Sequence, residues 1–255
     1  MNRNKTRRHL MFGALALGLA AGAQAWTWNL GSGERVDGNG EMGSEARSLG
    51  AFEAIRLSGN FKLKVRQAGG DTLEISADKN LLPYIETRVV ESKGGLKTLE
   101  IAPKNGYRLS SRQPVQVHVG MIVLRRLALE GSGDARVEGM KTPRLEVAVA
   151  GSGDVLLSEL FSEEASFSVA GSGDIQAQGR VNALKVSVAG SGDVKAADLA
   201  ADEVRVSVAG SGDVLVQANK QLKASIAGSG DVRYRGTPQI SSSVAGSGSI
   251  LPMSR

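Results

Sequence analysis

The residues in this chain that are best suited to chemistry form a repeated tetrapeptide, Gly-Ser-Gly-Asp. Glycine-rich loops that carry hydroxyl and carboxylate groups can cradle phosphates, bind calcium or simply make tight turns. Six copies are complete, and a seventh has serine in place of the aspartate. The copies begin at Gly131, Gly151, Gly171, Gly190, Gly210, Gly228 and Gly246.

The surroundings of the tetrapeptide disfavour two of these uses. A phosphate cradle leads into the N-terminus of a helix, usually with a lysine close by, whereas alternating residues typical of a strand follow each copy. Calcium-binding β-rolls repeat a turn with more glycines about every nine residues, roughly half the period found here. A structural turn is favoured, because glycine adopts positive φ angles and aspartate and serine hydrogen-bond free turn amides.

One ion-binding alternative remains open. Stacking the repeats in register would place their aspartates in a column of like charges, which repel each other. A bound cation would relieve this repulsion, and so would hydrogen bonds to turn amides or screening by solvent. We therefore keep a cation column as a candidate, formed by Asp154, Asp174, Asp193 and Asp213.

The spacing of the copies predicts the elements that hold the turns. Successive copies are 20, 20, 19, 20, 18 and 18 residues apart. Aligned on their glycines, the repeats show apolar columns alternating with polar columns on both sides of the turn, the period of a strand with one buried face. The apolar columns include Val155, Leu157, Val147 and Val149 in one repeat. Each repeat is thus a turn, a short strand, a second turn and a second strand.

A unit of this size cannot bury its apolar face alone, but stacked copies can. We therefore predict an all-β fold, a parallel β-solenoid whose coils hold about 19 residues and two strands each. This is a single-stranded β-helix, expected to be right-handed. A β-propeller is disfavoured, because its blades need four strands and roughly 40 residues. Small insertions are expected between the strands, near Gly179 and Ala218.

The chain upstream of the repeats divides into three predicted parts. Residues 1–25 combine a basic start, a short apolar run and Ala23-Gln24-Ala25, which is typical of an export signal cleaved after Ala25. Residues 26–48 are rich in glycine and polar side chains and are interpreted as a flexible lead-in. The solenoid domain is expected over 49–255, with irregular coils over 49–130 and the regular repeats over 131–255.

Composition narrows the possible functions. The predicted signal holds four of the 31 basic residues and none of the 26 acidic ones, so the mature chain has 27 against 26, a net charge of +1. This balance argues against nucleic-acid binding, and no transmembrane segment is expected in the mature chain. The chain has no cysteine, which rules out disulfides and thiolate metal sites. We predict no cofactor.

Catalysis also finds little support in the sequence. His118 is the only histidine after the signal and lies in an alternating segment without a matched nucleophile. Many parallel β-helices cleave acidic polysaccharides with acidic and basic residues on one face; Asp154, Asp174 and Asp193 supply only the acidic part. An outward serine column is a possible ligand face or a plain hydrogen-bonded ladder. That column is Ser168, Ser187, Ser207, Ser225 and Ser243.

Several motifs outside and within the repeats resemble a known family. They are Phe52-Glu53-Ala54-Ile55, the stretch Gly59–Val65, Leu81–Ile85, and Leu127–Asp134 followed by recurring Val-Ala-Gly-Ser-Gly-Asp. Together, from about Leu49 onward, they resemble the "putative auto-transporter adhesin, head GIN domain" family. The resemblance implies a secreted bacterial β-helical protein and says little about activity.

From these observations we predict an exported, non-catalytic module of the bacterial cell envelope that acts in adhesion through surface binding. The alternative is a carbohydrate-binding or polysaccharide-degrading β-helix. Expected partners are an envelope polysaccharide or a surface protein, and a second copy of the chain joined through the solenoid ends. The compartment is expected to be the periplasm, the cell surface or the extracellular space.

Overall fold

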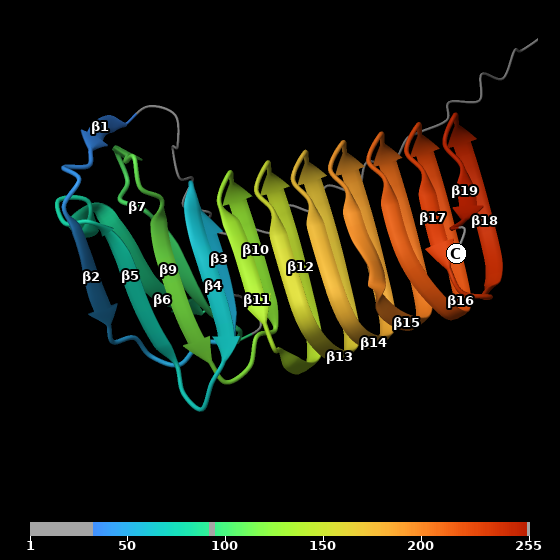
Figure 1. Ribbon diagram of the computed structural model, residues 1–255, viewed down its shortest axis with the longest axis horizontal. Helices are drawn as coiled ribbons and strands as arrows, with labels where there is room; N and C mark the ends of the chain where they lie inside the picture. Colours follow the sequence, from blue (N-terminus) through green and yellow to red (C-terminus); the bar gives the residue numbers. More distant parts are fainter. Residues whose placement is uncertain (1–32, 92–94, 254–255) are drawn as a thin grey trace, which may run out of the picture.

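A computed structural model describes residues 33–91 and 95–253. The predicted export signal and its cleavage site lie outside these residues. The described chain forms a parallel β-solenoid of about six turns, with an irregular cap of strands at its N-terminal end (Figure 1). The predicted fold class is confirmed.

The regular coils are built from long bent strands and short strands at the two ends. Strands β13 to β16 each run from one turn to the next and cover 15 to 17 residues. The strands of the regular part are β10 (Arg126–Gly131), β11 (Asp134–Glu138), β12 (Lys141–Gly151), β13 (Val155–Gly171), β14 (Ile175–Gly190), β15 (Val194–Gly210), β16 (Val214–Gly228), β17 (Val232–Arg235), β18 (Gln239–Gly246) and β19 (Ile250–Pro252).

The second turn predicted within each coil is a bend in one continuous strand rather than a break. In β13 the bend is at Glu159, whose φ is 55°, and in β14 it is at Gly179, whose φ is 136°. The pairing register shifts beside these positions, between Leu157 and Leu160 on β13. A bulge of this kind turns the chain while most ladder hydrogen bonds continue, which explains why the insertions are tolerated there.

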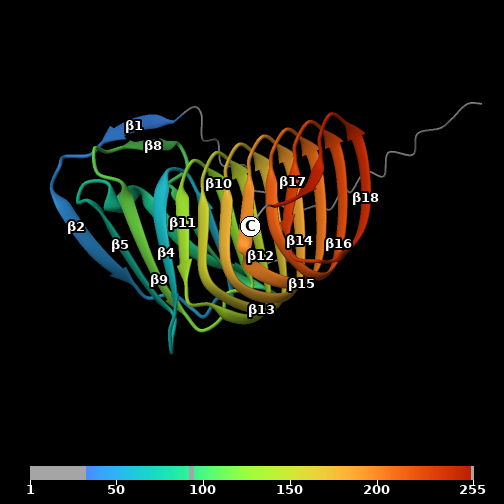
Figure 2. The ribbon, with the colours of Figure 1, turned by 45° about the vertical axis from the view of Figure 1, so that its right-hand side comes forward.

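Each coil contributes to two sheets that face each other across the core (Figure 2). We call one the groove face, made by β9 (Val115–Met121), β4 (Phe61–Gln67), β11, the first halves of β13–β16, β17 and β19. We call the other the serine face, made by β3 (Ala54–Ser58), β10, β12, the second halves of β13–β16 and β18. The glycines that begin the seven turns pair in register from Gly131 through Gly246.

The core is the set of inward apolar columns predicted from the repeats. In one coil, Val155, Leu157, Ala165, Phe167 and Val169 are all at most 3% exposed. Neighbouring coils place equivalent residues above and below them, so the interior is a continuous apolar stack. The last coil is the exception and is described below.

The N-terminal end is irregular because the chain leaves the stack and returns to it. The coil formed by β3 and β4 pairs with β10 and β11 on one side and with β7 and β9 on the other. The strands of this region are β1 (Glu34–Asp37), β2 (Met42–Arg47), β3 (Ala54–Ser58), β4 (Phe61–Gln67), β5 (Thr72–Asp78), β6 (Ile85–Glu91), β7 (Lys97–Pro103), β8 (Tyr107–Ser110) and β9 (Val115–Met121), with a 3-10 turn, η1 (Leu82–Tyr84).

The prediction of a flexible lead-in over 26–48 is wrong for its described part. Strand β1 pairs in parallel with β8, and β2 pairs antiparallel with β5. The Arg47 guanidinium also donates to the carbonyl oxygens of Leu82 and Ile85, at 3.0 and 2.7 Å. These strands are held by backbone and side-chain hydrogen bonds and not by an apolar face, so hydrophobic patterning could not reveal them.

Candidate functional site

The repeated turn requires glycine at two positions because the coils stack closely. Gly151 has a φ of 135°, and a Cβ placed there would lie 2.1 Å from the carbonyl oxygen of Gly131. A Cβ on Gly153 would lie 2.0 Å from the carbonyl oxygen of Gly133. The Gly151 carbonyl in turn accepts the backbone N–H groups of Ser172 and Gly173, at 2.9 and 3.1 Å. The glycines therefore serve the architecture of the turn.

The aspartates of the turns form a ladder along the solenoid. The Oδ1 of each aspartate accepts the backbone N–H of the aspartate in the next coil, at 2.9 to 3.4 Å. At the last coil, Ser249 donates both its backbone N–H and its hydroxyl to Asp231 Oδ1, at 2.9 and 2.7 Å. The members of this aspartate ladder are Asp134, Asp154, Asp174, Asp193, Asp213 and Asp231.

Hydrogen bonds lower the pKa of two aspartates in the ladder. Partial burial alone would raise the pKa of Asp174, but bonds from the Lys195 ammonium and the Asp193 amide outweigh burial and lower it. The Ser249 hydroxyl and amide lower the pKa of Asp231. The bond to Asp174 raises the pKa of Lys195. These carboxylates are therefore held in the ionised form.

The geometry of the ladder bears on the cation candidate at Asp154, Asp174, Asp193 and Asp213. The Oδ1 atom of each is already used by an amide. The Lys195 ammonium lies 2.9 Å from Asp174 Oδ2 and 3.9 Å from Asp193 Oδ2, so a side chain of the protein supplies positive charge there. Within residues 33–91 and 95–253, no three acidic or histidine side chains are grouped as metal ligands.

A groove of 590 Å³ runs across the coils beside the ladder, on the groove face. It crosses six strands, β9, β4, β11, β13, β14 and β15. At about 4.8 Å per strand, it is about 24 Å long. The charged and polar residues that line it are Lys62, Lys64, Gln116, His118, Asp134, Arg136, Asp154, Asp174, Gln176 and Lys195.

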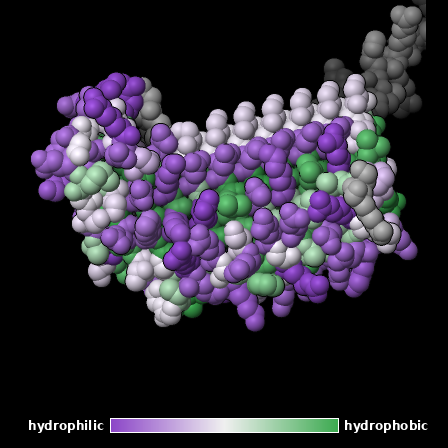
Figure 3. Space-filling view, viewed as in Figure 1, coloured by the Kyte–Doolittle hydropathy of each residue, from purple (hydrophilic) through white to green (hydrophobic). Residues whose placement is uncertain are grey.

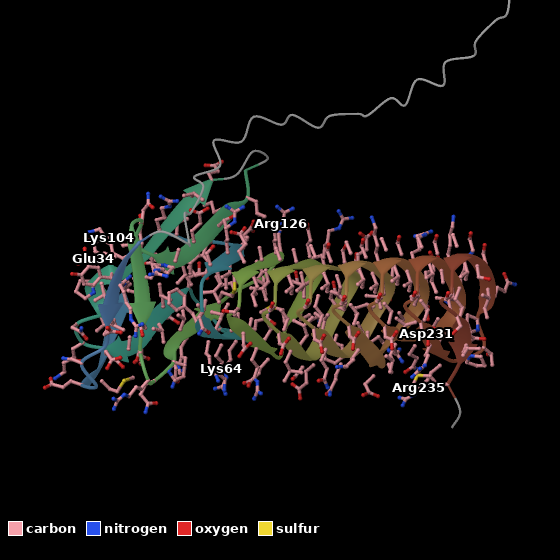
Figure 4. The ribbon with its side chains drawn as sticks, turned by 90° about the horizontal axis from the view of Figure 1, so that it is seen from above. Glu34, Lys64, Lys104, Arg126, Asp231 and Arg235 are labelled. Carbon is pink, nitrogen blue, oxygen red and sulfur yellow. The ribbon has the colours of Figure 1, made fainter. Side chains whose placement is uncertain are left out.

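Strand register brings the basic residues of this groove together. Lys64 lies beside His118 on β9 and beside Arg136 on β11, and Lys62 lies beside Asp134. Lys64 forms an ion pair with Glu138, at 3.2 Å. In the part of the chain that the structure describes, Lys62 and Arg136 form no ion pair of their own. Figure 4 shows Lys64 along one side of the solenoid and Arg126 on the opposite side.

His118 is placed by the same register. It is paired with Lys64 on one side and with Glu74 of β5 on the other, with its side chain at the groove surface. The side chains directly paired with it on the adjacent strands are thus the charged groups of Lys64 and Glu74.

The predicted serine column is present on the serine face. Ser168, Ser187, Ser207, Ser225 and Ser243 pair in register on successive strands. A column of alanines lies two residues further along each strand, so this face is flat and lined by small side chains. The alanines are Ala150, Ala170, Ala189, Ala209, Ala227 and Ala245.

The stacked turns, filled core and open polar groove define a repeat-built parallel β-solenoid. The chain belongs to the family described as "Putative auto-transporter adhesin, head GIN domain", whose sequence pattern matches residues 51–238. The resemblance predicted from the motifs is confirmed. No curated protein sequence matches the chain.

Solved structures share the fold. A "putative lipid binding protein" from Parabacteroides distasonis is 30% identical, with a TM-score of 0.72; the alignment covers 87% of this chain and all of that one. A "putative adhesin" from Bacteroides fragilis is 22% identical, with a TM-score of 0.79, over 86% of this chain and all of the other. A "putative adhesin" from Parabacteroides merdae is 22% identical, with a TM-score of 0.65, over 87% of this chain and all of the other.

Sequence reasoning found the turns and missed the groove. The turn residues repeat, and repetition made them visible. Lys62 and Lys64 precede the repeats, and Arg136 belongs to a column that holds leucine and glutamine in the next two coils. Only the pairing of β4 with β11 shows that these cations are neighbours.

Proposed function

We propose that this protein is a non-catalytic binding module of the bacterial envelope, which holds an acidic envelope polysaccharide on its groove face. The observation that carries the proposal is the pair of cations without ion-pair partners among the described residues, Lys62 and Arg136, in a groove that crosses six strands. Membership of a family named for adhesins supports a binding role.

The groove suits an extended polymer with repeated charges. Each exposed ion pair contributes only about 0.2–1 kcal/mol, so one sugar acid would bind weakly. A polymer that places several groups along a rigid groove gains affinity through simultaneous contacts. Asp134, Asp154 and Asp174 all repel anions, but only beside Asp134 does the groove bring Lys62, Lys64 and Arg136 together. The acidic groups would therefore bind near β4 and β11.

The hydrogen bonds of the ladder aspartates favour a binding role over a catalytic role. In polysaccharide cleavage a carboxylate must exchange protons with substrate or water. Asp174 and Asp193 instead accept amide hydrogen bonds within the turns, and Asp174 is paired with Lys195. We therefore propose no hydrolytic or lyase activity.

The proposed role requires export, which the start of the chain predicts. No helix in the described ranges is long and apolar enough to cross a membrane. The solved protein named for lipid binding suggests a second source of the same anionic chemistry, the headgroup of an acidic lipid. Apolar side chains fill the inside of the solenoid, so the acyl chains of a lipid could not enter it. A lipid would therefore have to bind through its headgroup.

Calorimetric titration of the mature chain tests the proposal. The probes are polygalacturonate, neutral dextran and vesicles of phosphatidylglycerol. We expect polygalacturonate to bind, dextran not to bind, and binding to weaken as salt rises. The double variant Lys62→Ala with Arg136→Ala should weaken binding at least about tenfold.

The matched control removes two cations from the opposite face, Lys185→Ala with Arg205→Ala, and should leave the affinity unchanged. Equal weakening by both double variants would show that net charge alone attracts the polymer and would contradict the proposal. Binding only to vesicles would assign the groove to lipid headgroups instead. Release of new sugar ends from polygalacturonate would contradict the non-catalytic role.

A further inference from the structure

The last coil leaves one edge of the solenoid open. Strand β18 pairs with β16, and no strand of the described residues pairs with its other edge. Ile240 and Val244 continue the inward columns of Leu222 and Ile226, yet they are 46% and 43% exposed. Figure 3 shows apolar surface at this end, on the right of the molecule. An uncovered sheet edge with apolar side chains is a surface for strand pairing.

The two ends of the solenoid differ in charge. The outermost strands of the N-terminal end, β2 and β6, carry charged side chains such as Glu45, Arg47, Glu86 and Glu91. Charges on an edge strand prevent pairing with another chain. Strand β18 reads Gln-Ile-Ser-Ser-Ser-Val-Ala-Gly and carries no charge. Among these outermost strands, β18 is therefore the one without charged side chains.

The aspartate ladder argues against adding a second molecule head to tail. Every coil that precedes another coil offers an aspartate Oδ1 to the next amide. The last turn has Ser249 at that position, and its hydroxyl donates back to Asp231. A further coil stacked in parallel would lack this acceptor. Because Ser249 ends the ladder, the last coil is better suited to an antiparallel neighbour than to a further parallel coil.

The backbone of β18 is in phase with such a neighbour. The N–H of Ser247 donates to Gly228 and so points back toward β16. Because successive residues of a strand point to alternate edges, the N–H and C=O groups of Ile240, Ser242 and Val244 point to the open edge. These three residues also point their side chains inward.

Because the same three residues offer backbone groups at the open edge and side chains to the core, β18 is complementary to a second copy of itself. When two copies of β18 pair antiparallel about a two-fold axis, the residues whose N–H and C=O groups point to the open edge form the hydrogen-bonded pairs. With the axis at Ser242, Ile240 of each copy lies opposite Val244 of the other. The apolar side chains that the last coil leaves exposed then cover each other.

We infer that a second copy of this chain covers the C-terminal coil, with β18 paired antiparallel to β18 of the other copy and the two-fold axis at Ser242. On the groove face the edge strand β19 has only three residues and includes Pro252, which has no N–H, so the pairing is confined to β18. The product is a closed dimer of about twice the solenoid length.

A cysteine on the axis tests the register. The chain has no cysteine, so any disulfide comes from the introduced residue. In Ser242→Cys the two Cα atoms would lie about 5.5 Å apart, within the range of a disulfide. Mild oxidation should yield a covalent dimer on a non-reducing gel. The control, Ser207→Cys, lies two coils away on the same face and should remain monomeric under denaturation.

A charge on the edge tests the association itself. By light scattering we expect a dimer for the wild type, and Val244→Lys should raise the dissociation constant at least about a hundredfold, because it buries an unpaired charge. Ala209→Lys, an exposed position two coils inward, should leave the dimer intact; circular dichroism would check that both variants fold. A wild-type monomer at high concentration, filaments that lengthen with concentration, or equal cross-linking of both cysteine variants would overturn the inference.

Discussion

At the scale of single residues, the turn glycines are fixed by the distance between coils. A side chain at Gly171 would meet the Gly151 carbonyl oxygen at 2.3 Å, on a backbone with a φ of 132°. Both the contact and the φ disfavour every other residue type. The obstacle is the backbone of the preceding turn, which cannot move without disturbing its own neighbours.

Gly171→Ala should therefore lower the free energy of unfolding by on the order of 1–3 kcal/mol or more. Chemical denaturation followed by circular dichroism would measure it. Gly69→Ala is the matched control, because its added Cβ meets no atom within 4 Å. A loss no greater for Gly171→Ala than for Gly69→Ala would show that the turns relax freely.

The aspartate ladder predicts a dependence of stability on pH. The folded-state pKa of Asp174 and of Asp231 is lowered, so their contribution is complete above the unfolded value of about 3.9 and is lost as the pH falls through the folded value. Asp231→Asn keeps an oxygen acceptor for Ser249 but cannot titrate.

We expect Asp231→Asn to lose less stability than the wild type between about pH 5 and pH 2. Thermal unfolding across the range would measure this difference. Glu163→Gln removes an exposed carboxylate that lies outside the ladder and serves as the control. Parallel curves for Asp231→Asn and the wild type would mean that the ladder carboxylate does not contribute.

At the scale of the strand, one coil shows how the sheet separates its two faces. Strand β13 holds two phenylalanines: Phe167 is fully buried in the inward column, and Phe161 is 52% exposed at the bend. The alternation along the strand places one inside, and the bulge places the other outside.

Phe167→Ala should destabilise the protein by about 3–5 kcal/mol, because it leaves a cavity between two stacked coils. Phe161→Ala should change stability by no more than about 0.5 kcal/mol. Urea unfolding of both variants measures the difference, and the same residue type in the same strand makes the comparison direct. Similar losses for the two would place Phe161 in a packed contact.

The repeats made the regular coils predictable, but they did not predict the residue at which each coil bends. Equivalent residues such as Val169, Val188 and Val208 recur at fixed distances from the turn, so sequence alone assigns them to the core. The bend has no constant residue: it falls at Glu159 in one coil and at Gly179 in the next. A bulge depends on pairing with the neighbouring coil, which a single repeat does not encode.

At the scale of the whole molecule, the N-terminal cap is the part that the sequence did not predict. Strands β7 and β9 lie outside β3 and β4, although they follow them in the chain. Chain order suggests stacking in sequence, and only the observed pairing shows the excursion. Strands β2 and β6 carry mostly polar side chains, so no buried face marked them as the cap.

The groove was hidden for the same reason as the cap. It lies where the first coil meets β11, and Lys64 and Arg136 are separated by more than a whole repeat in the chain. A site built from two segments that lie far apart in the sequence has no local motif that would reveal it.

The position of the β3–β4 coil has a consequence for how the chain can fold. As the first coil in the sequence, it can complete neither of its two sheet edges until β7, β9, β10 and β11 have been made. Once these strands have joined it, each later coil needs only the surface of the coil before it. Folding thus has a slow, non-local seed followed by growth in one direction, and coils can be added or removed at the growing end without disturbing the seed.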